Sequence, residues 1–196
     1  MGTSLHLNVE CKTDTGWEFV ETDVSQPGGY DMMGCLFGIR NCCNFEPIAP
    51  PDRGIPENAS DQFEPLRDDD EFLTTWVGLD EIEAIDWDEY ANRRDSRVSF
   101  YDEGGNYIKK VGAFSIPCEE DFDYMERVNN GEEVTLTLAK DWFEFDAGDE
   151  VTLVREWRQR KDVKNDGWED NFEIFRGLAD EYGGSKNVRM IAIAVG

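Results

Sequence analysis

Clusters of carboxylates are the most abundant chemical groups in this sequence. Asp68, Asp70 and Glu71 stand in one short run, and Asp86 and Asp88 stand close together in a second. Carboxylate oxygens are hard ligands of the kind that Mg²⁺ and Ca²⁺ prefer. One interpretation is therefore a phosphoester or nucleotide hydrolase that depends on Mg²⁺ or Ca²⁺ and uses these five residues as ligands. Neither run has the spacing of an EF-hand loop, and such clusters also arise by chance in a chain this acidic.

Other catalytic arrangements find little support in the residue types. His6 is the only histidine, so any Ser–His or Cys–His chemistry would depend on this one residue. The five cysteines are scattered, which does not suit a tetrahedral zinc site. Neither G-x-G-x-x-G nor the Walker pattern occurs. The sequence therefore leans towards a protein that is not an enzyme, and it predicts no cofactor outside the metal-dependent alternative.

A basic stretch interrupts the acidic chain near its C-terminal third. Arg155, Trp157 and Arg158 lie within four positions, and further cations follow. These cations could pair with the acidic surface of the protein itself, which is the favoured interpretation. Alternatively, arginine beside tryptophan suits stacking on a base or holding a phosphate, so the three residues are also candidate binding residues.

The net charge of −25, from 44 acidic and 19 basic residues, limits the classes of partner. Phosphate contacts need Lys and Arg, so the charge argues against nonspecific binding to nucleic acid or anionic membranes. A membrane partner and direct nucleic-acid binding are therefore not expected. A halophilic-type, solvated surface is the default explanation of the acidity, and an acidic nucleic-acid mimic is the alternative.

The first residues and the cysteines bear on the cellular compartment. Residues 5–10 alternate between apolar and polar types and do not form the apolar core of a signal peptide. No stretch approaches the roughly 18 apolar residues of a membrane span. An odd number of cysteines without a C-x-x-C pair favours reduced thiols. We therefore expect a cytoplasmic protein.

Three periodic segments indicate the fold class. Leu5, Leu7, Val9 and Cys11 alternate with polar residues, which predicts a half-buried strand. A helical apolar stripe over 168–182 predicts an amphipathic helix ended by Gly183, and the apolar run 188–195 predicts a central strand. In all, about seven strands and about four helices in mixed order predict a single α+β domain over 1–196, with a largely antiparallel mixed sheet.

A short helix over 30–39 is expected to lead into a long proline-rich loop. Gly34 and Gly38 are four residues apart on one face of that helix, so the sheet or the following loop can approach it closely. Residues 44–70 hold five of the seven prolines and show no periodicity. Such long loops tend to be functional or disordered.

Four blocks of sequence carry a resemblance to a known family: YDMMGCLFGIRN (30–41), PIAPPDRGIPENAS (47–60), TTWVGLDEIEAIDWDEY (74–90) and NVRMIAIAV (187–195). They resemble a family of uncharacterised phage, prophage and actinobacterial proteins. In that family a tyrosine precedes an apolar helix ending in Val/Ile-Arg-Asn, and an Arg-Gly-Leu-Pro loop and an Asp-Trp-Asp block follow. The resemblance covers about 1–90 and the last strand. It implies a shared origin and fold, without an established activity. Family members often carry an Asp-x-His-Ser step before the tryptophan; this chain lacks it, so no histidine-dependent role is predicted.

The favoured hypothesis is a non-enzymatic binding or accessory protein of viral or prophage type that acts on a host protein. The recognition surface would be the loop 44–70 together with Arg40, Asn41, Arg53 and Trp76. Arg40 could equally be a structural arginine bonded to loop carbonyls. The sequence predicts a protein partner but no oligomeric state.

Overall fold

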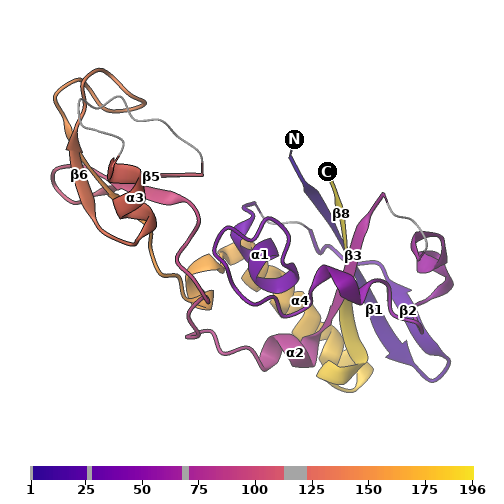
Figure 1. Cartoon of the computed structure of the whole chain (residues 1–196). Helices are drawn as coiled ribbons and strands as arrows, with labels where there is room; N and C mark the ends of the chain where they lie inside the picture. The colour runs from indigo at the N-terminus through magenta and orange to yellow at the C-terminus, as the bar shows by residue number, and fades with distance from the viewer. Residues whose placement is uncertain (1, 26–27, 68–70, 113–122) are drawn as a thin grey trace. The chain divides into compact units, whose positions relative to one another are not determined.

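The structure is a computed structural model that describes residues 2–25, 28–67, 71–112 and 123–196 (Figure 1). The chain divides into two compact units. The first comprises residues 1–41, 45–89 and 159–196, and the second comprises 42–44 and 90–158. Both contain helices and antiparallel strands, so the predicted α+β class is confirmed. That 1–196 form one domain stays a prediction.

Within the described residues, eight strands form two sheets of four, whereas the sequence predicts about seven strands in one sheet. All the described strand pairs are antiparallel. The described strands between residues 90 and 158 pair with one another, because this segment forms its own core. Alternation in a sequence identifies a strand, but it does not say which strand will be its neighbour.

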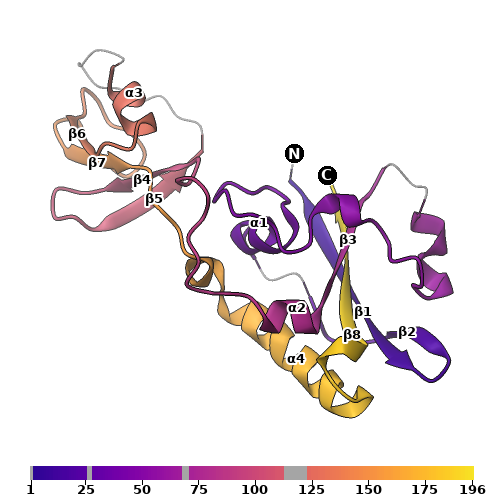
Figure 2. The same ribbon diagram turned by 60° about the horizontal axis from the view of Figure 1, so that its bottom comes forward.

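The first sheet has the strand order β2-β1-β8-β3. Its members are β1 (Ser4–Thr13), β2 (Gly16–Val20), β3 (Leu73–Gly78) and β8 (Val188–Val195). β8 lies between β1 and β3, as its apolar run predicts. Ser4 is paired with Val195, so the two ends of the chain lie side by side (Figures 1 and 2).

The long helix α4 (Asp166–Tyr182) packs against β1 and β8 (Figure 2). The side chain of Asn165 caps its first turn by accepting a hydrogen bond from the Trp168 backbone N–H. Gly183, with a left-handed φ of 85°, ends it. Trp168, Phe172, Phe175 and Ala179 are buried, which confirms the predicted apolar stripe.

Helix α1 (Asp31–Phe37) confirms the short helix expected before the loop, and α2 (Leu79–Glu83) follows β3. The two glycines of α1 are approached by the returning chain and not by the sheet. A Cβ on Gly34 would lie 2.7 Å from Cα of Asn41, and one on Gly38 would lie 3.2 Å from Pro47. Gly38 also ends the helix with a φ of 73°. The glycines therefore let the chain fold back tightly onto α1.

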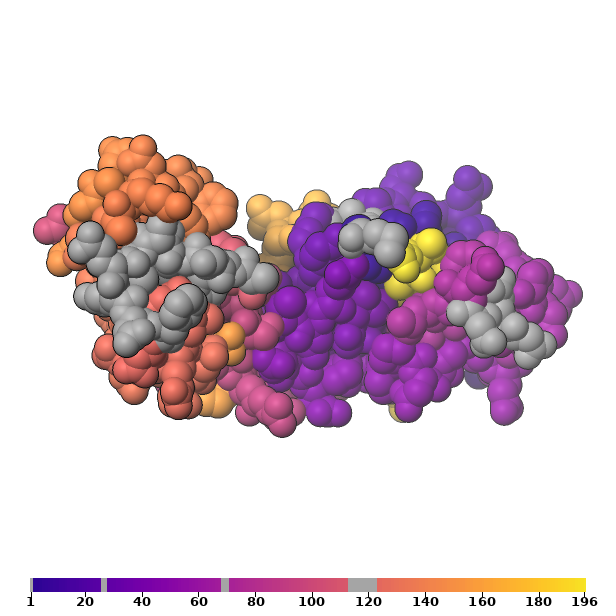
Figure 3. Space-filling view, turned by 45° about the horizontal axis from the view of Figure 1, so that its top comes forward, coloured from indigo at the N-terminus to yellow at the C-terminus, as the bar shows by residue number. Residues whose placement is uncertain are grey.

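The proline-rich loop is described from residue 44 to 67 and contains two short 3₁₀ helices, η1 (Pro51–Arg53) and η2 (Asp61–Leu66). It follows the outer edge of β3. The Thr75 hydroxyl donates to the carbonyl of Ala49 at 2.9 Å, and Arg53 Nη1 donates to the carbonyl of Trp76 at 3.1 Å. Figure 3 shows the purple residues of this part of the chain spread over one face of the first unit, beside the yellow end of β8.

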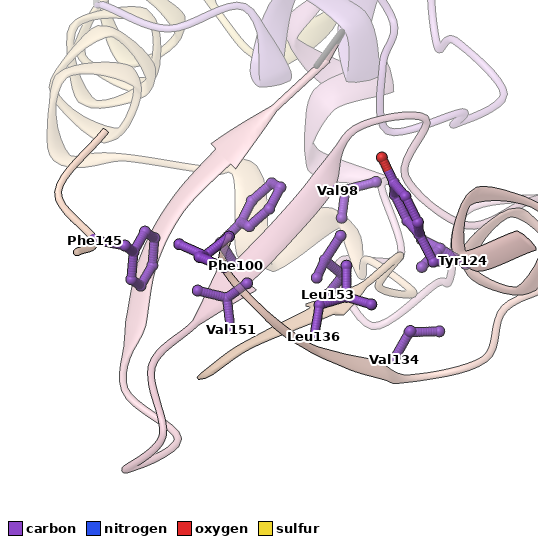
Figure 4. Close-up of a cluster of buried hydrophobic side chains, with 10 residues drawn as sticks. Val98, Phe100, Tyr124, Val134, Leu136, Phe145, Val151 and Leu153 are labelled. Carbon is purple, nitrogen blue, oxygen red and sulfur yellow. The ribbon is translucent and has the colours of Figure 1, made fainter. Parts of the chain in front are cut away.

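The second unit has the strand order β5-β4-β7-β6. Its elements are β4 (Val98–Tyr101), β5 (Tyr107–Val111), α3 (Asp123–Asn129), β6 (Val134–Thr137) and β7 (Glu150–Val154). Figure 4 shows its separate core, in which Phe100, Leu136, Leu153 and Tyr124 point towards one another. Within the described ranges, no helix is long and apolar enough to cross a membrane.

Candidate functional site

The polar face of the first sheet holds a buried ion pair. Glu10 of β1 lies opposite Arg189 of β8. Arg189 donates to Glu10 Oε2 from Nε at 2.8 Å, and Nη2 lies 2.7 Å from the same oxygen. The exposed fractions of the two side chains are 4% for Arg189 and 0% for Glu10. Such a pair persists in the interior only if hydrogen bonds satisfy its remaining polar atoms.

The proline-rich loop supplies those hydrogen bonds. The Ser60 backbone N–H donates to Glu10 Oε1 at 2.7 Å. Arg189 Nη1 donates to Asn58 Oδ1 at 2.8 Å, and Nη2 donates to the Asn58 carbonyl at 3.2 Å. The loop is therefore fixed to the sheet through two buried charges.

Two tryptophans and two arginines alternate across the same region. The guanidinium carbon of Arg189 lies 3.9 Å from the ring centre of Trp17 and 5.7 Å from that of Trp76. The guanidinium carbon of Arg53 lies 5.2 Å from the ring centre of Trp76. Each distance is within the range of a cation–π interaction. We call Trp17, Arg189, Trp76 and Arg53 the tryptophan ladder.

Arg53 is held in the ladder by Glu81 of α2. Its Nη1 and Nη2 donate to Glu81 Oε2 and Oε1 at 2.9 and 2.7 Å. The Gly78 backbone N–H donates to Oε2 at 2.9 Å. Burial alone raises the pKa of Glu81, but the hydrogen bonds from Arg53 and Gly78 outweigh it, so the pKa lies below its ordinary value. The hydrogen bond to Glu81 raises the pKa of Arg53, and both groups stay charged at neutral pH.

The ladder lines a pocket of about 890 Å³ in the first unit. Lys12 and Asn58 are among the other residues of its wall. Pockets that bind ligands commonly measure about 300–1,000 Å³ and combine aromatic rings with a few placed polar groups. We call this cavity the tryptophan pocket.

Only two of the four residues predicted for the recognition surface line the tryptophan pocket. Arg53 and Trp76 do so. Arg40 instead donates from Nε to the Thr3 hydroxyl at 2.9 Å and lines a smaller pocket of about 360 Å³. Asn41 donates to the Phe45 carbonyl at 2.7 Å and accepts from the Phe45 backbone N–H at 3.2 Å, so its side chain closes the turn after α1.

The predicted basic residues lie in the second unit. The Arg158 carbonyl accepts a hydrogen bond from the Ala91 backbone N–H at 2.9 Å. The Arg155 carbonyl accepts one from Arg94 Nη1 at 2.8 Å. Trp157 remains 46% exposed. These three residues therefore belong to a different unit from the tryptophan pocket.

The candidate metal ligands are only partly described. Asp68 and Asp70 lie outside the described residues, and Glu71 is exposed. Asp88 Oδ1 lies 2.6 Å from Lys161 Nζ, and Asp86 Oδ1 accepts a hydrogen bond from the Asp88 backbone N–H. Among the residues that the structure describes, no group of three His, Cys, Asp or Glu side chains could hold a metal ion. The metal-dependent hydrolase stays a prediction.

Sequence reasoning missed Glu10, Trp17, Asn58 and Arg189. Arg189 carried a usable signal, because it is the one charge inside the apolar run 188–195. A lone arginine in a central strand needs a buried partner, and a carboxylate on a neighbouring strand is the usual one. Nothing in the sequence indicated that the partner would be Glu10.

No protein-family model, curated protein or solved structure matches the chain in comparisons with each. The resemblance to a phage and actinobacterial family therefore stays a prediction.

Proposed function

We propose that the chain is a non-enzymatic binding protein whose recognition site is the tryptophan pocket, and that its partner is a protein. The accessory role in a virus or integrated element, which the sequence resemblance implies, is part of this proposal. The observation that carries it is the tryptophan ladder, which joins β2, β8, β3 and the proline-rich loop in one wall.

The residue types of the ladder suit recognition of a protein segment. Tryptophan and arginine are the residues most enriched among those that dominate the binding energy of protein interfaces. In the ladder Glu10 and Glu81 already hold the two arginines, and the arginines lie against the two indoles. Little conformational entropy therefore remains to be lost when a partner binds. A preorganised wall of this kind favours affinity without any catalytic group.

The charges of the pocket favour a peptide over an ion or a polyanion. Glu10 and Glu81 neutralise the two ladder arginines. Lys12, Lys186, Glu57 and Asp80 also line the pocket and contribute two charges of each sign. A peptide segment offers backbone donors and acceptors as well as side chains of both charges, and it can therefore satisfy such a wall.

Selection from a displayed random-peptide library tests the proposal. Peptides selected on the wild-type protein should lose at least tenfold in affinity for the Trp76→Ala variant, because the ladder loses the indole between its two arginines. The Trp157→Ala variant removes a tryptophan of the second unit and is the matched control, which should bind normally. Peptides that bind Trp76→Ala as tightly as the wild type, or a selection that yields no binder, would contradict the proposal.

A further inference from the structure

Two exposed aromatic side chains line one pocket in the second unit. Tyr90 is 58% exposed and Trp157 is 46% exposed. Both line an open, mainly apolar pocket of about 450 Å³. That volume lies within the range of about 300–1,000 Å³ that is usual for small-molecule sites.

The segments that carry these rings run beside each other. The Ala91 backbone N–H donates to the Arg158 carbonyl at 2.9 Å, and the Asp95 backbone N–H donates to the Glu156 carbonyl at 2.8 Å. The paired segments bring Arg93 and Arg94 together with Arg155 and Arg158. Four arginines on two short segments are unusual in a chain with 44 acidic and 19 basic residues.

The two acidic side chains of these segments, Asp95 and Glu156, bind groups other than Arg94. Asp95 is fully buried and binds Arg97 and Lys110, with Nη2 and Nζ at 2.8 and 3.2 Å from Oδ2. Glu156 accepts hydrogen bonds from the hydroxyls of Ser99 and Tyr101. Its Oε2 lies 3.3 Å from Lys110 Nζ and 3.9 Å from Arg158 Nη1. These carboxylates therefore do little to neutralise Arg94.

Arg94 lies directly against one of the rings. Its guanidinium carbon is 5.6 Å from the ring centre of Trp157, and its Nη1 donates to the Arg155 carbonyl. Arg155 Nε is buried and has no acceptor among the residues that the structure describes. A cation is thus held against Trp157, one of the two rings that line the pocket.

We propose that Tyr90, Trp157 and Arg94 form a binding site for a nucleotide, that is, a planar heterocycle that carries a phosphate. The base would stack on the exposed rings, because every base has a π-face that can lie on an aromatic side chain. Arg94 would bind the phosphate through charge-assisted hydrogen bonds. The site is independent of the tryptophan pocket.

A free nucleotide and a nucleotide within a single strand both offer a planar base and a phosphate. The net charge of −25 opposes a long polyanion, since each additional phosphate is repelled by the acidic surface. A single nucleotide unit meets only the local cations. We therefore expect the site to bind only one or a few nucleotides of a ligand.

Calorimetric titration of the full chain with three probes tests the site: adenosine 5′-monophosphate, a single-stranded thymidine octamer and inorganic phosphate. The expected result is binding of the monophosphate or the octamer, and at least tenfold weaker binding of inorganic phosphate, which lacks a ring to stack. Binding of both nucleotide probes identifies a free nucleotide as a sufficient ligand. Binding of the octamer alone identifies a strand as the source.

Three variants test whether the nucleotide binds at these residues. Trp157→Ala should weaken nucleotide binding about tenfold, since stacking contributes about 1–3 kcal/mol per base and 1.4 kcal/mol is tenfold. Arg94→Ala should weaken the binding of adenosine 5′-monophosphate, whereas adenosine, titrated as a fourth probe without a phosphate, should bind the variant and the wild type alike. Tyr107→Ala removes an aromatic ring of the same unit that is 55% exposed and should change nothing.

Several results would overturn the inference. They are the absence of binding at millimolar probe, unchanged affinity in Trp157→Ala, and phosphate binding as tight as that of the nucleotide. Trp76→Ala should leave nucleotide binding intact, so failure here is distinguishable from failure of the peptide-binding proposal.

Discussion

Arg189 of β8 and Glu10 of β1 form an ion pair of 2.7 Å in the interior of the first unit. The first and last strands of the chain and the proline-rich loop converge on this pair, because Asn58 and Ser60 bind its remaining polar atoms. Arg189 also contacts both tryptophans of the ladder. The buried pair is therefore one of the two ion pairs that hold the tryptophan pocket, beside that of Arg53 and Glu81.

Removing Glu10 should destabilise the first unit strongly. In a Glu10→Ala variant the Arg189 guanidinium stays buried without its carboxylate, and breaking a buried pair in this way costs about 3–5 kcal/mol. The free energy of unfolding, measured with urea, should fall by that amount. The affinity of peptides selected on the tryptophan pocket should fall as well.

Glu57→Ala is the matched control for the unfolding measurement. Glu57 is an exposed carboxylate of the same loop. Its removal should change the free energy of unfolding by no more than about 0.5 kcal/mol. Equal losses in the two variants would show that the buried pair has no special role.

Gly34→Ala should destabilise the chain by about 1–3 kcal/mol, the usual cost of an added methyl group in a packed interior. The new Cβ would lie 2.7 Å from Cα of Asn41, and this backbone atom can move only if the turn after α1 moves. Thermal unfolding followed by circular dichroism would measure the effect.

The corresponding change in α4 should have the opposite sign. Gly177 lies in the helix interior, and a Cβ there meets no atom within 4 Å among those described. Gly177→Ala should therefore stabilise the chain by up to about 1 kcal/mol, from helix propensity alone. A loss of stability in Gly177→Ala would contradict the open space around that position. Unchanged stability in Gly34→Ala would contradict the close approach of Asn41 to α1.

The elements of the first unit could be predicted from the sequence because they have strong local periods. The apolar run of β8 and the stripe Trp168, Phe172, Phe175 on α4 are confirmed by burial. In β1 the alternation is confirmed only in part, because Glu10, on the face predicted to be polar, is buried as well. Each of these patterns depends only on which side chains are buried when the chain folds. The fold class followed from them without any knowledge of strand order.

The candidate site could be predicted only in part, because it depends on pairing between distant segments. Arg53 and Trp76 were expected in a recognition surface, and both line the tryptophan pocket. Trp17 and Arg189 join them because β2, β1 and β8 pair in a particular register. The two residues are 172 positions apart in the sequence, from 17 to 189. No local pattern encodes such a register, so the ladder was not visible in the sequence.

Buried thiols should resist alkylation in the folded protein. Burial, followed by the nearby charges of Glu181 and Glu10, raises the pKa of Cys11 to about 11, and burial raises the pKa of Cys35. Since the thiolate is the reactive form, iodoacetamide at pH 8 should modify the partly exposed Cys42 well before either of them. Peptide mapping by mass spectrometry would give the order, and the difference should disappear in guanidinium chloride. Modification of Cys11 as fast as Cys42 in the folded chain would contradict it.

Asp95 should give the second unit a stability that is lost in acid. Its burial raises the pKa of the carboxyl, but hydrogen bonds from Arg97 and the charge of Lys110 outweigh burial and hold the pKa below the ordinary value of 3.8. A carboxyl with a lowered pKa stabilises the fold above that ordinary value, and this contribution disappears as the pH falls through the lowered pKa. Asp95→Asn should therefore be less stable than the wild type by about 3 kcal/mol at pH 7, and the difference should shrink below about pH 4. Hydrogen exchange in β4 and β7, followed from pH 7 to pH 3, would measure it, and a difference that stays constant or grows in acid would contradict the assignment.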